Sequence, residues 1–537
     1  MKKLTFRSYN FRRAAVAAIL LAAGTSIVSC KDFTELAPIS LASEESAFAS
    51  PGNIKLAMMG VYESAAIGTY QNLKSSARGY PFGAAAIEQG EMRGEDMLNI
   101  DQFYAITYEG GANPTSLNNV TMWHTLYALI NQANILIEGV QKAGAKGVIT
   151  DAEAKAYEGE ARFMRALSHH ELLVHFSFPY ADAAGGKWGV PYRTKAITSL
   201  AAYEEGLKMD RGTVKDCYTK LIADLDFAEA NLPDKQPDGV QRATKGAAIA
   251  LKARIKQHMG DWDGVIAESN KLIPASAPYK SPIGAFQLTA EPDGPFTSYK
   301  NNTESIFSIA NGPNANGGSN GALPAMFGPA SLNGRGLVAT SPILYNASFW
   351  KATDKRRALL QVYQPTTGSR YYFNYKYRDY TTRADWAPML RYAEVLLTAA
   401  EAHARKGQND RALALLNAVR NRSVEAGDQF TTPPADLVLA ILQERRIELA
   451  GEGRRWADIH RLALDAAYGF RGIPAKMKKE QMKLDGTDYN AVTPPTFPAT
   501  GGVPSYAYES YRFLWPIPAE ETAANPTLRA QQNKLSD

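Results

Sequence analysis

Apolar residues recur at helical spacing along the first half of the chain, from about Asn53 to Leu272. The stripes consist of Met122, Leu126, Leu129 and Ile130, then Phe163, Leu167 and Val174, then Val214, Leu221, Ile222 and Leu225. Residues three and four apart lie on one face of an α-helix, so each stripe predicts a helix with one buried side. Because such helices bury that side against one another, the pattern predicts a mainly α fold.

Two stretches share a register around a glycine, one at Gly260 and one at Gly407. An apolar residue lies eleven positions before each glycine and another lies six after it, namely Ile249 and Ile266, and Leu396 and Leu413. This recurrence predicts helical hairpins of the tetratricopeptide kind, in which each pair buries its apolar face by stacking on neighbours. Since 147 residues separate the two glycines, we expect a single domain with an interrupted array.

The interruption, at about 275–385, has a different composition. Residues 311–335 hold six Gly, five Asn and three Pro, which favours turns over regular elements. Aromatic residues alternate over 371–377, which predicts a short strand, and a second Pro/Gly-rich loop spans about 489–506. We therefore expect long irregular loops with a few short strands on the helical scaffold, and such loops usually carry recognition.

The first 29 residues read as a secretory signal peptide. Five basic residues and no acidic ones precede the apolar run 14–23, and small residues follow up to Cys30. Cys30 directly follows Ser29, as in a bacterial lipobox, so we expect Cys30 to be the lipid attachment site and the new N-terminus. The alternative is a general export signal that is cut elsewhere. No other apolar run is long enough to span a bilayer.

Charge and cysteine content exclude several classes of protein. The chain has 59 basic and 54 acidic residues, and five of the basic ones lie in the signal peptide, which leaves 54 of each. A neutral remainder offers no surface for phosphate backbones, so nucleic acid is not an expected partner. Cys30 and Cys217 are the two cysteines, which excludes a disulfide framework.

Catalytic signatures were not found in the sequence. It contains no H-E-x-x-H pair, no G-x-S-x-G elbow and no phosphate-binding glycine loop. His170 shares the stripe of Phe163, which favours a hydrogen-bonded core histidine over a metal ligand, and Cys217 faces a helix core as an inert thiol. We therefore expect no enzymatic activity, no cofactor and no metal.

The densest charged motif lies between residues 444 and 458. It consists of Glu444, Arg445, Arg446, Glu448, Arg455, Trp456 and Asp458. Arg445 interrupts an apolar helical stripe, and a guanidinium on such a face needs a carboxylate partner because desolvation is costly. The motif is either an anion site or a structural set of buried ion pairs. We favour the structural interpretation because acids and bases balance here.

Several motifs, in order, resemble the SusD/RagB family of outer-membrane nutrient-binding lipoproteins. Those in the second half are residues 391–402 (RYAEVLLTAAEA), the ERRxELxxEGxRWxD segment beginning at Glu444, and 514–518 (LWPIP) with Asn525-Pro526. Those in the first half lie at 123–134, 160–166, 189–191 and 242–248. The tail after Pro526 departs from the usual Gln-Asn-Pro-Gly ending. The resemblance implies a signal peptide (1–29), an N-terminal helical half (30–270) and a C-terminal part (271–537) that contains the 275–385 insert.

The resemblance also implies a function. Family members capture oligosaccharides, or peptides in a RagB-like minority, and pass them to a SusC-like TonB-dependent transporter in the outer membrane. We expect such an oligosaccharide-binding lipoprotein, facing the cell exterior. The alternatives are a peptide-binding member and a repeat-type protein-interaction scaffold. Aromatic residues in loop-like segments are the candidate ligand contacts, namely Trp350, Tyr345, Tyr80, Tyr104 and Tyr108.

Overall fold

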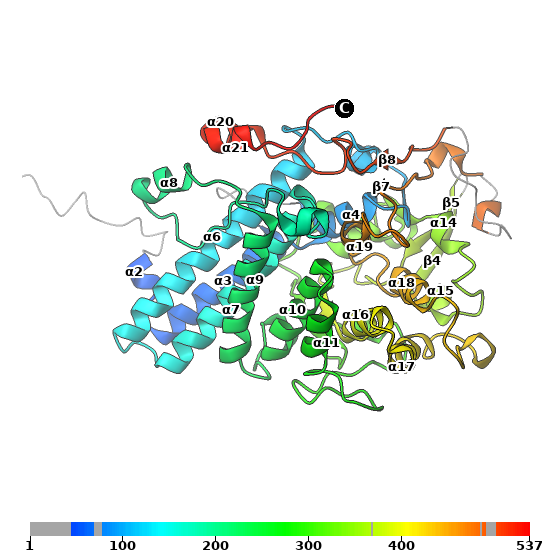
Figure 1. Cartoon of the computed structure of the whole chain (residues 1–537), viewed down its shortest axis with the longest axis horizontal. Coiled ribbons are helices and arrows are strands. Elements are labelled where there is room, and N and C mark those ends of the chain that lie inside the picture. Colours follow the sequence, from blue (N-terminus) through cyan, green and yellow to red (C-terminus); the bar gives the residue numbers. More distant parts are fainter. Residues whose placement is uncertain (1–43, 69–77, 367–368, 484–485, 490–500) are drawn as a thin grey trace, which may run out of the picture.

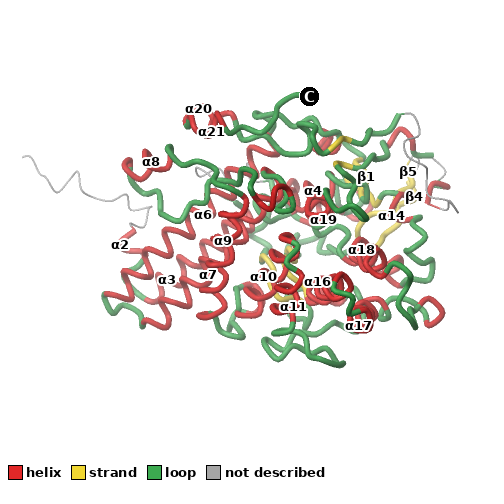
Figure 2. The backbone as a smooth tube through the Cα atoms, viewed as in Figure 1, coloured by secondary structure: helices red, strands yellow, loops and turns green. Residues whose placement is uncertain are grey.

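The computed structural model describes residues 44–68, 78–366, 369–483, 486–489 and 501–537. About half of this part of the chain is helical, and its few short strands pair two by two without closing a sheet (Figure 2). The expectation of a mainly α fold with long irregular loops is therefore confirmed. Cys30 and the predicted signal peptide lie outside the described residues.

Long helices form one end of the molecule, on the left of Figure 1. They are α3 (Pro51–Ile67), α6 (Leu117–Ala145), α7 (Asp151–Phe176) and α9 (Val214–Asn231). α6 packs on α7, and α7 in turn packs on α9. Thr150 and Glu153 form a capping box that starts α7, and Thr213 and Asp216 do the same for α9. The apolar stripes of the sequence face each other here.

The two predicted helical hairpins are confirmed. α10 (Lys245–Met259) turns into α11 (Trp262–Ser269) at Gly260, and α16 (Tyr392–Arg405) turns into α17 (Asn409–Arg420) at Gly407. Both glycines have φ near +71°, the left-handed region that ends a helix at little steric cost for glycine. α16 packs on both α10 and α11, so hairpins far apart in the sequence stack side by side.

Three further helices complete the centre of the molecule. α18 (Leu437–Glu448) packs on α16 and α17, and α19 (Arg455–Leu462) packs on α4 (Ala84–Met92). Every residue of α4 is buried. Gly90 of α4 lies against Gly453, where a Cβ atom would stand 2.6 Å from the Gly453 carbonyl oxygen. A side chain at position 90 would therefore separate α4 from the C-terminal part.

The strands form four antiparallel pairs. These are β1 (Met97–Asn99) with β3 (Val338–Thr340), β2 (Ser305–Ile309) with β6 (Ala387–Arg391), β4 (Gln361–Thr366) with β5 (Ser369–Asn374), and β7 (Gly472–Ile473) with β8 (Tyr506–Ala507). Tyr371 and Phe373 lie in β5, as predicted, whereas Tyr375 and Tyr377 lie beyond its end. The β1–β3 and β2–β6 pairs tie the loop-rich segment 275–385 to the rest of the chain.

The remaining helices are short. They are α2 (Glu44–Ala47), α5 (Ala105–Tyr108), α8 (Leu200–Gly206), α12 (Gly294–Thr297), α13 (Leu323–Phe327), α14 (Pro342–Tyr345), α15 (Lys355–Leu359), α20 (Ala519–Ala524) and α21 (Pro526–Ala530). Among the described helices, none combines the length and the apolar character needed to cross a membrane.

Candidate ligand-binding site

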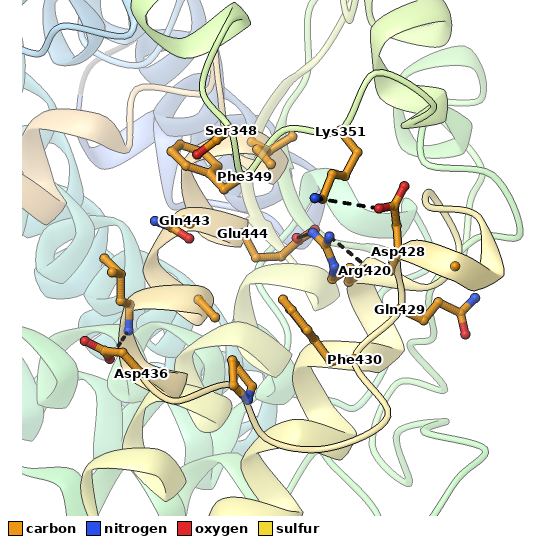
Figure 3. Close-up of a pocket in the computed structure, with 15 residues that line it drawn as sticks. Ser348, Phe349, Lys351, Arg420, Asp428, Gln429, Phe430, Asp436, Gln443 and Glu444 are labelled. Carbon is orange, nitrogen blue, oxygen red and sulfur yellow. Dashed lines mark hydrogen bonds and ion pairs between the residues drawn. The ribbon is translucent and has the colours of Figure 1, made fainter. Parts of the chain in front are cut away.

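A cavity of about 480 Å³ opens between the turn after α14, the loop from α17 to α18, and one face of α18 along its length (Figure 3). Ligand sites in proteins are typically concave and of this size. We call it the α18 pocket. Its lining includes Ser348, Phe349, Lys351, Arg420, Asp428, Gln429, Phe430, Asp436, Leu439, Gln443 and Glu444.

Two aromatic rings line the α18 pocket, and both are partly exposed. The Arg446 guanidinium carbon lies 5.3 Å from the ring centroid of Phe349, and that of Arg420 lies 4.8 Å from the centroid of Phe430. In Figure 3 the two rings lie on different sides of the cavity. Each ring therefore has a cation within contact range and part of its surface open to a ligand.

The charged groups around the pocket have partners. Lys351 Nζ lies 3.7 Å from Asp428 Oδ1, and Thr353 Oγ1 donates to Asp428 Oδ2 at 3.1 Å. Asp436 Oδ1 accepts from the Leu439 amide, which caps α18. The pocket thus presents little net charge, and the side chains of Ser348, Gln429 and Gln443 add neutral donors and acceptors.

Arg420 holds the loop that carries Phe430. Its Nη2 donates to the Asp428 carbonyl oxygen at 3.2 Å, while its Nη1 donates to Glu444 Oε2 at 3.0 Å. Asn417 Nδ2 donates to the Phe430 carbonyl oxygen at 2.8 Å. The loop is therefore fastened to α17 at two points and linked through Arg420 to α18.

Glu444 connects the pocket to a buried ion-pair network beneath it. The network has five cations and five carboxylates, namely Arg356, Lys376, Arg391, Arg420 and Arg422 with Glu304, Asp354, Glu444, Glu448 and Glu452. Burial alone would raise the pKa of Glu448, but Arg422, Arg391 and Arg356 hold that pKa well below its ordinary value. Because it has equal numbers of opposite charges, the network is neutral overall. It supports the α18 pocket from beneath, through Arg420 and Glu444.

The other members of the charged motif form separate buried ion pairs. Arg445 Nε lies 3.2 Å from Asp458 Oδ2. Arg446 and Arg455 both pair with Glu95, at 2.9 and 2.5 Å. Burial would raise the pKa of Glu95, but Arg455 and Arg446 lower it to about 2. Trp456 is fully buried, and its Nε1 donates to the Val174 carbonyl oxygen at 2.9 Å. Each of these arginines thus has a carboxylate partner inside the protein.

The five aromatic residues expected to contact ligand are all buried. Trp350 and Tyr345 pack against each other and against Arg357, whose guanidinium carbon lies 4.8 and 4.4 Å from their ring centroids. Tyr108 donates to the Met477 carbonyl oxygen at 2.6 Å, and Tyr80 and Tyr104 lie in the core. Their contact with a ligand stays a prediction, and their rings pack against protein in this structure.

Phe349 and Phe430 were missed by the sequence reasoning. Phe349 precedes the chosen Trp350, and Phe430 lies in the loop before Pro433-Pro434. Aromatic residues in loops between predicted helices were the available signal, but nothing in the sequence places these two beside one pocket.

A second exposed aromatic surface lies next to Tyr104. The guanidinium carbons of Arg335 and Arg78 lie 4.9 and 5.5 Å from the ring centroid of Phe103, and Arg335 also donates to Asn320 Oδ1 at 2.8 Å. Phe103 thus lies between Arg78, which precedes α4, and Arg335 of the Asn/Gly-rich loop 311–335.

One detail of the core differs from expectation. His170 is fully buried, as the sequence indicated, but among the described residues neither ring nitrogen has a hydrogen-bond partner. Its ring instead packs edge-on against His258, at 4.7 Å between centroids. Burial therefore holds the pKa of His170 well below its ordinary value, and the ring is neutral.

Sequence comparisons give matches in both halves of the chain. The family described as "SusD family" matches residues 355–535, and the family described as "Starch-binding associating with outer membrane" matches residues 81–256. The chain is similar to SusD-like protein P2 of Formosa agariphila, with 26% identity over 508 residues that cover 83% of this chain and 91% of the relative.

Solved structures share the fold. A SusD superfamily protein from Bacteroides fragilis matches with a TM-score of 0.71 and 25% identity, over 89% of this chain and 99% of the other. Surface glycan-binding protein A from Bacteroides uniformis matches with a TM-score of 0.67 and 20% identity, over 90% and 99%. The interrupted helical array is thus an arrangement found in other proteins.

Proposed function

Since the chain is a member of the SusD-like family, we propose that it is a lipoprotein of the bacterial outer membrane that binds an oligosaccharide without cleaving it. The bound oligosaccharide passes to a SusC-like TonB-dependent transporter. Cys30 carries the lipid, and the body faces the cell exterior. The family description of starch binding and outer-membrane association supports this proposal.

The observation that carries the proposal is the pair of partly exposed rings in the α18 pocket. The apolar faces of a sugar ring stack on aromatic side chains, and its hydroxyl groups bond to amides and hydroxyls of the kind that Gln443 and Ser348 offer. An aromatic contact contributes about 0.5–1.5 kcal/mol beyond the area it buries. Two such contacts therefore contribute about 1–3 kcal/mol, a factor of about 5 to 140 in affinity, and buried area and hydroxyl contacts supply the rest. Binding of this modest strength suits a carrier that must release its ligand.

Charge favours an uncharged ligand in this pocket. Lys351 pairs with Asp428, and Arg420 pairs with Glu444. A polyanionic ligand would need a surplus of arginine or lysine, which the neutral mature chain does not supply. A peptide is the second candidate ligand, because the amides of Gln429 and Gln443 can also bond to a peptide backbone.

The acidic side chains at the pocket support binding rather than catalysis. Glycoside hydrolysis uses two carboxyl groups on either side of the scissile bond, one of them held protonated. Asp428 is paired with Lys351, Glu444 is paired with Arg356 and Arg420, and Asp436 caps α18. These contacts leave the three carboxylates in structural roles.

Calorimetry on the soluble Cys30→Ala chain tests the proposal, with neutral glucans of several lengths and a peptide mixture as ligands. Phe349→Ala and Phe430→Ala should each weaken glycan binding by about two- to tenfold, the loss of one aromatic contact. Phe470→Ala is the matched control, because Phe470 is exposed and lies 5.4 Å from an arginine, Arg455, outside the pocket lining. Equal glycan affinity in all three variants would refute the proposed site, and binding to peptides alone would refute the glycan.

A further inference from the structure

A groove of about 550 Å³ lies between α2 and the last turns of α6, at the end of the molecule away from the α18 pocket (Figure 1). We call it the α2–α6 groove. It is lined by Glu45, Phe48, Gly139, Lys142, Ala143 and Lys146, among others. Apolar surface forms most of the groove, and the two lysines are exposed at its edge.

The Phe48 ring packs against the backbone of α6 at Gly139. A Cβ atom at Gly139 would stand 2.2 Å from the Phe48 ring, so the ring lies directly on the helix backbone at this point. Phe48 is only partly buried, which leaves part of the ring open to the groove. The close contact fixes the position of α2 on α6.

We infer that the α2–α6 groove is the docking site of this chain's own residues 31–43. These residues lie outside the described part of the chain and lead directly into α2, whose Glu45 lines the groove. The segment brings four large apolar side chains, namely Phe33, Leu36, Ile39 and Leu41. Its acidic residues, Asp32 and Glu35, complement the lysines at the groove edge.

The length of the segment fits the groove. From Gly139 to Lys146 the helix rises about 10 Å, at 1.5 Å per residue. Three or four extended residues span the same distance, at about 3.3 Å each. Thirteen residues separate Cys30 from Glu44, so the segment can return along the groove from α2 and still reach a membrane anchor.

Docking would set the position of the body at the membrane. This consequence depends on the proposed lipid attachment at Cys30. With residues 31–43 held in the groove, the lipid would leave the protein beside the end of α6 and not from the tip of a long tether. The α18 pocket, at the far end, would then be held away from the anchor.

Disulfide trapping tests the inference on the soluble Cys30→Ala chain. Lys146→Cys provides an exposed thiol in the groove, and it is combined in turn with cysteine at positions 33, 36, 39 and 41. Lys155→Cys is the matched control, because Lys155 is an exposed lysine on α7, the helix packed on α6, and lies outside the groove lining. Cys217 is buried and stays in place.

At least one of the four pairs with Lys146→Cys should oxidise more than tenfold faster than the same position paired with Lys155→Cys. Equal rates for all four positions would overturn the inference. Glycan binding by the untrapped variants should stay at the level of the parent chain. If no chain binds glycan, the parent included, the proposed function fails. The trapping rates would still decide whether residues 31–43 dock in the groove, because they do not depend on glycan binding.

Discussion

Replacing Arg445 by methionine removes a guanidinium that is only 3% exposed and sits between α16 and α19. Arg445 contacts both carboxylate oxygens of Asp458 at 3.2 Å and donates to Thr398 Oγ1 at 3.1 Å. Methionine keeps much of the stem's packing, so the change mainly tests the charge. Asp458 remains buried in the variant and loses one of its two cationic partners.

The expected loss follows from what remains around Asp458. Breaking a buried ion pair by removing one partner costs about 3–5 kcal/mol. Arg461 Nε still donates to Asp458 Oδ1 at 2.7 Å, so the carboxylate is not left alone. We therefore expect the variant to lose about 3 kcal/mol of unfolding free energy. Arg391→Met should lose about 5 kcal/mol, because Arg391 contacts Glu304, Glu448 and Glu452 together.

Urea unfolding at several pH values measures the loss. Burial would raise the pKa of Asp458, but Arg445 and Arg461 hold that pKa well below its ordinary value. The stability from this depressed pKa is present above the unfolded value near 3.8 and is lost as the pH falls further. The difference between parent and Arg445→Met should therefore be largest near pH 7 and shrink below about pH 4. A loss under 1 kcal/mol at pH 7, or glycan binding abolished in a variant of unchanged stability, would refute the structural role.

Three further predictions concern other parts of the chain. Cys30→Ala should leave the protein unlipidated and released from membranes, because no described helix can span a bilayer; outer-membrane fractionation that survives a salt wash would contradict this. Trp350→Ala should lower the unfolding free energy by about 3–5 kcal/mol, because the indole is buried beneath Arg357; a stable variant with lost glycan affinity would instead make Trp350 a ligand contact. Glu88 is fully buried beside Tyr104, and burial raises its pKa to about 8. Stability should therefore fall as the pH rises from about 4.5 to 8, by up to about 1.4 kcal/mol per unit. Glu88→Gln should flatten that slope in urea titrations, and an unchanged slope would show that other groups cause it.

The helical hairpins could be predicted because their signals are local. A glycine with positive φ and an apolar residue at fixed offsets mark each turn, and these features do not depend on distant residues. The apolar stripe around Phe163 is an equally local signal, and it predicts the buried side of α7. The stripe also predicts that His170 is buried, but a hydrogen bond to that ring depends on neighbours from other helices, and His258 packs against it edge-on instead.

The site could not be predicted because it depends on distant contacts. Phe349 and Phe430 line one pocket only because the turn after α14 and the loop from α17 to α18 both lie beside α18. The sequence favoured Trp350 because an indole has the largest face, yet the turn places that face under Arg357. The ion-pair partners of Glu448 also cannot be predicted from the neighbouring sequence, because Arg391 and Arg422 come from other elements.

The most direct test of the proposed glycan site is a crystal structure of the chain with a neutral oligosaccharide of several units. The proposal predicts sugar density in the α18 pocket, with one ring stacked on Phe430 or Phe349 and hydroxyl groups within hydrogen-bond distance of Gln443. Sugar bound at Phe103 with the α18 pocket empty would contradict the proposed site and move it to the second aromatic surface.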